Sequence, residues 1–158
     1  MLVAQVSDNR GYIVEVGDEV PNLSLEMMDG SQLTLAELRG KVVVLQFTAS
    51  WCGVCRQEMP HLESDIWQEF QDNEFVLIGI DCKEEKKKAQ RFIEEMSITY
   101  PTAYDTDGEL FYQFAERNAG VTRNIVIDQD GNIAFLTRLF DMDEFNSMKD
   151  KIAELLSE

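Results

Sequence analysis

Two cysteines three positions apart are the residues of this sequence best suited to covalent chemistry. Cys52 and Cys55 follow the apolar run 42–47 and open a pattern that becomes helical near Arg56. A thiol at the start of a helix meets unpaired backbone N–H groups and the positive end of the helix dipole, which stabilise its thiolate. In Cys-X-X-Cys motifs the thiol pKa falls from ~8.5 to about 3.5–7.5. The spacing therefore predicts a pair that can close and reopen a disulfide.

The elements that position this pair are predicted from hydrophobic periodicity and turn residues. Strands are expected at 22–27, 32–35, 42–47, 75–80, 124–128 and 133–139, and helices at 52–71, 84–96, 109–118 and 141–156. The alternation within 12–16 allows a short strand. We also expect a helical turn opened by Thr34-Leu35-Ala36-Glu37 and a connection without regular structure over 97–108. Pro60 should kink the helix that carries the cysteines.

Strands that alternate with helices predict parallel neighbours in one sheet, and the turn Gln129-Asp130-Gly131-Asn132 predicts an antiparallel hairpin at its edge. This order is an α/β layout typical of the thioredoxin fold, a central mixed sheet flanked by helices with an N-terminal β-hairpin extension. We expect one domain over residues 1–158, in which 1–16 form a weakly structured N-terminal extension.

Composition and charge restrict the class of partner. The 158 residues carry a formal net charge of −16, which repels nucleic-acid phosphates and anionic lipid headgroups and argues against binding to either. Three cysteines, one close pair and an odd third, fit redox chemistry better than a disulfide scaffold. Residues 1–8 show no basic region followed by a long apolar run, so we expect no signal peptide and no membrane span. A chain from which an export signal had been removed would look the same.

Over residues 17–156 the sequence resembles the thioredoxin-like family, and within it the extracytoplasmic branch typified by the TlpA and ResA proteins, which is grouped with alkyl-hydroperoxide-reductase-like domains. The tryptophan and Cys-X-X-Cys set between a strand and a helix is the most specific part of the match. The matching residues are Gly17-Asp18, Pro21, Leu23, 35–38, Gly40-Lys41, 51–56, Glu58-Met59-Pro60, Tyr100-Pro101, 124–128 and Gly131.

This resemblance implies roles for individual residues. Cys52 would be the attacking thiolate and Cys55 the resolving thiol, and Glu84 would be an acid below the cysteines that passes a proton to Cys55. Asp81 is an alternative for that proton role, and Glu84 could instead pair with Lys88 on its helix. The resemblance also places the substrate contacts beside the cysteines and in the loop that faces them, at Trp51, Gly53, Val54, Val121 and Thr122. Trp51 would shield the sulfurs from water or serve as a core aromatic.

The sequence departs from the family in the loop that faces the cysteines. Thioredoxin folds carry a cis-proline there, whereas this segment reads Gly120-Val121-Thr122-Arg123. Because a cis bond before a residue other than proline costs ~3 kcal/mol, we expect a trans bond before Thr122. Arg123 resembles the arginine that peroxiredoxins bring towards their reactive cysteine, and there it would stabilise the Cys52 thiolate. The alternative is a surface arginine at the start of a strand.

The function predicted from these residues is thiol–disulfide exchange with protein substrates, in the service of cellular redox homeostasis. The enzyme would need no metal, nucleotide or flavin, and a partner protein would supply or accept the electrons. The Gly53-Val54 dipeptide leaves both the reductant and the oxidant direction open. The resemblance favours a bacterial, periplasmic or otherwise extracytoplasmic monomer, with the cytoplasm as the alternative.

Two other functions compete with this one. A thiol peroxidase is favoured by Arg123, but the proline, threonine and cysteine spacing of peroxiredoxins is absent. A non-catalytic binding module is opposed by the intact pair Cys52 and Cys55. Cys82 is expected to be an inert thiol at the end of a strand, and His61 an exposed helix residue. Cys52, Cys55, Cys82 and His61 could together bind zinc only if separate elements brought them to one place, so we expect no metal.

Overall fold

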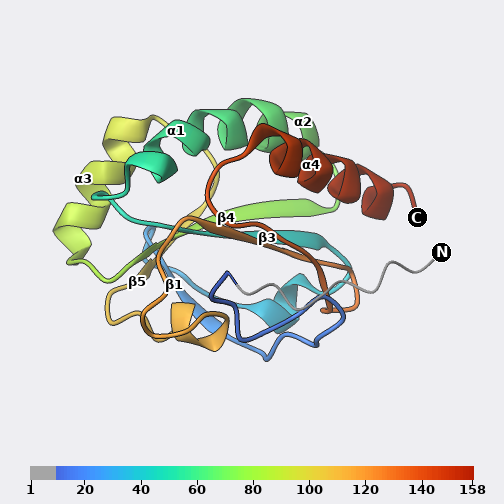
Figure 1. The fold of residues 1–158 in the computed structure, drawn as a ribbon, viewed down its shortest axis with the longest axis horizontal. Helices are drawn as coiled ribbons and strands as arrows, with labels where there is room; N and C mark the ends of the chain where they lie inside the picture. Colours follow the sequence, from blue (N-terminus) through green and yellow to red (C-terminus); the bar gives the residue numbers. More distant parts are fainter. Residues whose placement is uncertain (1–9) are drawn as a thin grey trace.

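Residues 10–158 are described by a computed structural model, and a seven-stranded mixed sheet runs through this part of the chain (Figure 1). Its strands lie in the order β2-β1-β5-β4-β3-β6-β7. The strands are β1 (Ser24–Met27), β2 (Gln32–Thr34), β3 (Val42–Thr48), β4 (Phe75–Cys82), β5 (Thr102–Asp105), β6 (Arg123–Ile127) and β7 (Ile133–Leu136). The helical segments are η1 (Leu35–Leu38), α1 (Gly53–His61), η2 (Leu62–Trp67), α2 (Gln68–Phe70), α3 (Lys86–Met96), η3 (Phe111–Gln113) and α4 (Met142–Leu156).

The centre of the sheet is β3, whose seven residues are all buried. A strand covered on both faces needs a continuous apolar run, and Val-Val-Val-Leu-Gln-Phe-Thr supplies one. β3 pairs in parallel with β4, from Val42 opposite Phe75 onwards, and antiparallel with β6, where Phe47 lies opposite Arg123. The carboxyl end of β3 therefore meets the amino end of β6, so the loops on either side of this meeting point are neighbours.

Side chains that alternate along the strands divide the core into two layers. On one face of the sheet, Val42, Val44 and Leu77 pack under η2, α2 and α4. On the other face, Val43 and Leu45 pack against η1, η3 and the N-terminal segment. Figure 1 shows the same division, with α1, α2, α3 and α4 all on one side of the sheet. This is the predicted layout, a mixed sheet flanked by helices with the hairpin of β1 and β2 added near the N-terminus.

The helical run that carries the cysteines continues from Gly53 to Phe70 but changes its winding midway. Pro60 lies in the last turn of α1, and the chain then forms the wider π-helical turn η2. Since proline has no N–H to donate, the regular hydrogen-bond ladder is interrupted at this point. The N–H of Leu62 bonds to the carbonyls of both Glu58 and Met59. The irregularity predicted at Pro60 thus takes the form of a local change in helix type.

Two expectations about secondary structure are wrong, and one strand that the sequence allows does not form. The expected connection 97–108 contains β5, which is held between β1 and β4 by pairing on both sides. The helix expected over 109–118 is a single 3-10 turn, η3. No strand forms within 12–16, where the backbone of Tyr12 joins Ala115 in an isolated β-bridge. In each case contacts with distant segments decide the outcome over local pattern.

The prediction that residues 1–8 hold no export signal falls outside the described residues, as does most of the expected N-terminal extension. Within residues 10–158, no helix combines the length and the apolar character that crossing a bilayer requires.

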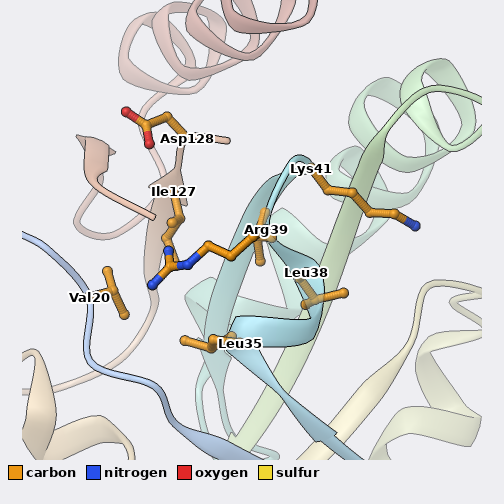
Figure 2. Close-up of a pocket in the computed structure, with 8 residues that line it drawn as sticks. Val20, Leu35, Leu38, Arg39, Lys41, Ile127 and Asp128 are labelled. Carbon is orange, nitrogen blue, oxygen red and sulfur yellow. The ribbon is translucent and has the colours of Figure 1, made fainter. Parts of the chain in front are cut away.

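A small cavity lies at the end of the sheet away from the cysteines (Figure 2). Its volume is about 10 Å³, room for a single water molecule. The side chain of Arg39 extends across it towards Val20 and Ile127. Arg39 also covers Gly131, where a Cβ atom would lie 1.1 Å from its Nη1. Val43, at the beginning of β3, lines this cavity, whereas the cysteines follow the end of that strand. The cavity is therefore too far from the cysteines to contribute to their chemistry.

Replacing the fully buried Ile66 of η2 tests how much the core layer under the helices contributes. Ile66→Ala should lower the free energy of unfolding by about 2–5 kcal/mol, because it leaves a cavity in a packed layer. Urea titration followed by circular dichroism measures the change. Ile13→Ala is the matched control, since Ile13 is 56% exposed and its loss should cost less than ~0.5 kcal/mol. Equal losses in the two variants would contradict this description of the core.

Candidate active site

The structure brings Cys52 and Cys55 together as a disulfide at the start of α1, with their Cα atoms 5.3 Å apart. Cys52 is the N-cap residue, and its Sγ accepts the backbone N–H of Cys55 at 3.1 Å. This N–H bond and the helix dipole would stabilise a thiolate on Cys52 in the reduced protein. Cys52 is 7% exposed and Cys55 fully buried, so an incoming molecule can reach only the first sulfur.

The loop before β6 faces the disulfide, as the pairing of β3 with β6 requires. The carbonyl oxygen of Val121 lies 3.8 Å from Cys52 Sγ. The peptide bond between Val121 and Thr122 is cis, so the predicted trans bond is wrong. The prediction used only the local preference of the bond, whereas Thr122 is held from several sides. Its carbonyl accepts the backbone N–H of Leu139 at 3.0 Å and Nη1 of Arg138 at 3.3 Å.

Glu58 is a site residue whose role the sequence reasoning missed. It lies one helical turn after Cys55 on the buried face of α1, which also includes Met59, and it is 1% exposed. Its Oε1 accepts hydrogen bonds from Thr122 Oγ1 at 3.3 Å and from Asn124 Nδ2 at 3.1 Å. Glu58 therefore connects the cysteine helix to the loop that faces Cys52. The spacing of three residues from Cys55 was the available signal, because it puts both side chains on one face.

Burial raises the pKa of Glu58 from 4.5 to about 7, although the hydrogen bonds from Asn124 and Thr122 act in the opposite direction. The charge of Glu144 raises this pKa further. A carboxyl group with a pKa near neutrality can both take up and release a proton at physiological pH. Glu58 thus has the acid–base property that the sequence had suggested for Glu84.

Glu84 holds the loop that leads into the cysteine motif. Its two carboxylate oxygens accept the backbone N–H of Ser50 at 2.7 Å and the hydroxyl of Ser50 at 2.6 Å. Burial raises the pKa of Glu84, but hydrogen bonds from Asp81 and Ser50 outweigh it and leave the pKa below its usual value. The charge of Lys88 acts in the same lowering direction, in line with the pairing considered for these two residues. Glu84 is thus an ionised anchor for Ser50.

Asp81, the alternative proton carrier, forms an acid pair with Glu84. Burial, a hydrogen bond with Glu84 and the charge of Glu84 together raise the pKa of Asp81 to about 9. Neither oxygen of an ionised Asp81 would have a hydrogen-bond donor among residues 10–158. At neutral pH the protonated carboxyl of Asp81 instead donates to Glu84. The pair shares one proton and one negative charge.

Arg123 begins β6 and is 1% exposed, so the alternative of a surface arginine is excluded. Its Nε donates to Gly120 O at 2.8 Å and its Nη2 to Arg10 O at 2.6 Å. Its guanidinium carbon lies 4.6 Å from the ring centroid of Tyr12. These contacts tie Arg123 to the loop that faces the cysteines and to the N-terminal segment. Its predicted action on Cys52 stays a prediction.

The predicted substrate contacts lie on both sides of Cys52. Trp51 is 58% exposed, which excludes the core-aromatic alternative. Gly53 is also exposed, and a Cβ atom there would meet no atom within 4 Å. Val54 is half-buried, whereas Val121 and Thr122 are buried in the facing loop. Trp51 and Gly53 thus form an open surface beside the reactive sulfur.

The two remaining candidate residues lie apart from this surface. Cys82 is fully buried and its Sγ lies 3.5 Å from Thr48 O. Burial, followed by the charges of Asp105 and Asp81, raises the pKa of Cys82 far above its usual value, as expected for an inert thiol. His61 stacks on Phe140 at the far end of α1, with 5.1 Å between ring centroids. Among residues 10–158, no three side chains of the metal-ligating types gather in one place.

Comparison with known proteins identifies the family. A sequence model of the AhpC/TSA family matches residues 16–136. The chain belongs to this family. The thiol-disulfide oxidoreductase ResA of Bacillus thuringiensis subsp. konkukian is 26% identical over 120 residues, which cover 76% of this chain and 68% of that protein.

Solved structures confirm the thioredoxin fold of this family member. The solution structure of a protein disulfide isomerase candidate from Bacteroides thetaiotaomicron is 47% identical, covers 96% of both chains and superposes with a TM-score of 0.91. A secreted thiol-disulfide isomerase from Corynebacterium glutamicum, 23% identical, covers 97% of this chain and 96% of its own with a TM-score of 0.79.

The raised pKa of Glu58 predicts how stability depends on pH. Between pH 4.5 and about 7 the unfolded chain releases this proton while the folded chain keeps it, so this contribution to stability is complete below pH 4.5 and is lost as the pH rises through about 7. Over this window the free energy of unfolding should fall by up to about 3 kcal/mol more in the wild type than in Glu58→Gln.

Urea titrations at a series of pH values measure this difference. Asp81 contributes a slope of its own, but it contributes equally to both proteins and cancels in the comparison. Glu95→Gln on the exposed side of α3 is the matched control and should leave the wild-type slope unchanged. Parallel pH curves for wild type and Glu58→Gln would contradict the raised pKa.

Proposed function

We propose that this chain is a thiol–disulfide oxidoreductase that exchanges the Cys52–Cys55 disulfide with protein substrates. The observation that carries the proposal is the asymmetry of the pair, an accessible sulfur that receives a backbone N–H and a buried partner one turn into α1. The ResA and disulfide isomerase relatives carry names for the same chemistry.

In the reductive direction the Cys52 thiolate attacks one sulfur of a substrate disulfide. The substrate S–S bond breaks, a mixed disulfide forms, and the released substrate sulfur takes up a proton. The Cys55 thiol then loses its proton and attacks Cys52 Sγ, which forms the internal disulfide and releases the second substrate thiol. The substrate has gained two electrons and two protons, and the enzyme is oxidised. A partner protein then reduces the Cys52–Cys55 disulfide back to two thiols. In the oxidative direction the same steps run in reverse.

Glu58 is the proton acceptor that we assign to Cys55. It lies on the same buried face of α1, and its pKa of about 7 lets it accept a proton without a large cost in free energy. Glu84, ionised and bonded to Ser50, serves to fix the loop before Trp51. Trp51, Gly53 and Val54 on one side of the sulfur, and Val121 and Thr122 on the other, would contact the substrate.

We assign the protein to an extracytoplasmic compartment, the bacterial periplasm or its equivalent, where it would act as a single-domain monomer without a cofactor. Support comes from the secreted relative with the same fold and from the TlpA and ResA resemblance of the motif. Protein disulfides, the proposed substrates, form and persist in oxidising compartments of this kind.

Cysteine variants test the proposed reaction. Cys52→Ser should abolish reduction of insulin disulfides, whereas Cys55→Ser should leave the first step intact and accumulate a mixed disulfide that a gel shift detects, because the resolving thiol is gone. Cys82→Ser is the control and should retain activity, since that thiol is buried.

Hydroperoxide consumption by the same variants distinguishes this function from that of a thiol peroxidase. The family name and Arg123 are the two observations that favour a peroxidase. Peroxide turnover without turnover of disulfides would reverse the assignment. A reduced pair that neither reagent oxidises, and that alkylating agents do not modify at neutral pH, would point to a non-catalytic binding module.

Arg123→Ala tests the electrostatic role of this arginine. If its charge acts on Cys52, the pKa of the Cys52 thiol, followed by thiolate absorbance or by alkylation rate against pH, should rise in the variant. Arg117→Ala is the control, since this arginine lies over the ring of Tyr112. An unchanged thiol pKa in folded Arg123→Ala would remove the role.

A further inference from the structure

A groove with three cationic side chains lies between α1 and α3, directly beside the cysteine motif. Its volume is about 200 Å³. The groove is lined by Ser50, Arg56, Lys88, Arg91, Phe92 and Glu95. Ser50 precedes Cys52 by two residues, at most about 7 Å of extended chain. A protein that presents a disulfide to Cys52 therefore brings its neighbouring residues over this groove.

The charge of the groove is opposite to that of the whole chain. Three cations and one carboxylate line it, whereas the sequence has 14 lysines and arginines against 30 aspartates and glutamates. At physiological ionic strength charges are screened over about 8 Å, so a docked partner responds to the groove more than to the net charge of −16. The ionised Glu84 lies beyond Ser50, where its oxygens accept two hydrogen bonds from that residue and its charge interacts with Lys88.

One cation is fixed and two are available. Arg56 Nε donates to Ser50 O at 3.0 Å, its guanidinium lies 4.9 Å from the ring centroid of Phe92, and its Nη1 pairs with Glu95 at 3.0 Å. Neither Lys88 nor Arg91 lies within ion-pair distance of a carboxylate in the described range 10–158, although the charge of Lys88 acts on Glu84 at longer range. Arg56 is thus held by three contacts, and the charges of Lys88 and Arg91 can meet an incoming anion.

The helix dipole does not account for the position of Lys88 in α3. The first turn of α3 begins with Lys86, Lys87 and Lys88 and contains no acidic residue. Cations at this end of a helix are disfavoured by the helix dipole. Lys86 in this turn pairs with Glu26, whereas the charge of Lys88 faces the groove against the preference of the dipole, which is consistent with a use of that charge outside the helix.

We propose that this groove docks an acidic segment of the partner protein, a run of aspartate or glutamate within a few residues of the partner's reacting cysteine. The carboxylates of that segment meet Lys88 and Arg91 while its cysteine sulfur lies at Cys52. This docking rests on the thiol–disulfide exchange proposed above and identifies which protein substrates or redox partners that exchange favours.

Two cyclic peptides with the same disulfide and opposite flanks test the docking. One carries three aspartates next to its cysteine and the other three lysines, and a neutral small disulfide, hydroxyethyl disulfide, reports the chemistry alone. At low salt kcat/KM should be higher for the acidic peptide. Lys88→Glu/Arg91→Glu should lower kcat/KM for the acidic peptide by about ten-fold, because two favourable charge contacts become unfavourable. The same variant should leave turnover of hydroxyethyl disulfide unchanged.

Lys149→Glu/Lys151→Glu on α4 is the matched control, since it changes the net charge equally and lies on another helix. Equal rates for the two peptides with the wild type, or equal losses in both double variants, would overturn the docking. A loss for hydroxyethyl disulfide as well would show that the substitutions act on the cysteines. Failure of the wild type to reduce hydroxyethyl disulfide at all would instead overturn the proposed function.

Discussion

Backbone hydrogen bonds between β3 and β6 decide where the reactive sulfur meets the rest of the molecule. Because β6 runs antiparallel to β3, the loop that enters β6 lies next to the loop that leaves β3, and Val121 comes to face Cys52. The pairing of β3 with β4 places Asp81 opposite Thr48, at the same end of the sheet. The site is thus assembled from three chain segments that one central strand aligns.

Three carboxyl groups near this end of the sheet differ in protonation because their surroundings differ. Glu58 is buried and receives two hydrogen bonds, which leaves its pKa near 7. Asp81 is buried against another acid and stays protonated, whereas Glu84 receives hydrogen bonds from Ser50 and Asp81 and stays ionised. The same functional group is therefore ionised at one position, protonated at the second and poised between the two states at the third, where we propose that Glu58 carries a proton.

Local sequence was sufficient for the elements whose signal is long and periodic. The apolar run of β3, the helix α4 and the hairpin of β6 and β7 were all predicted. β5 was not, because its four residues gain their stability from pairing with β1 and β4.

The site shows the same division between local and distant determinants. The two cysteines follow from their spacing, but the importance of Glu58 depends on Thr122 and Asn124, which lie 64 and 66 residues away along the chain. The cis bond before Thr122 and the burial of Arg123 likewise depend on tertiary contacts that no local pattern encodes.

The position of Cys82 decides what the odd number of cysteines means. Its side chain has no exposed surface, and it lies at the end of a strand that is paired on both sides. Two folded copies of this chain therefore cannot be cross-linked through it. Covalent dimers that form under oxidising conditions must arise through the Cys52 and Cys55 pair or through unfolded molecules, so their appearance reports on the state of the preparation.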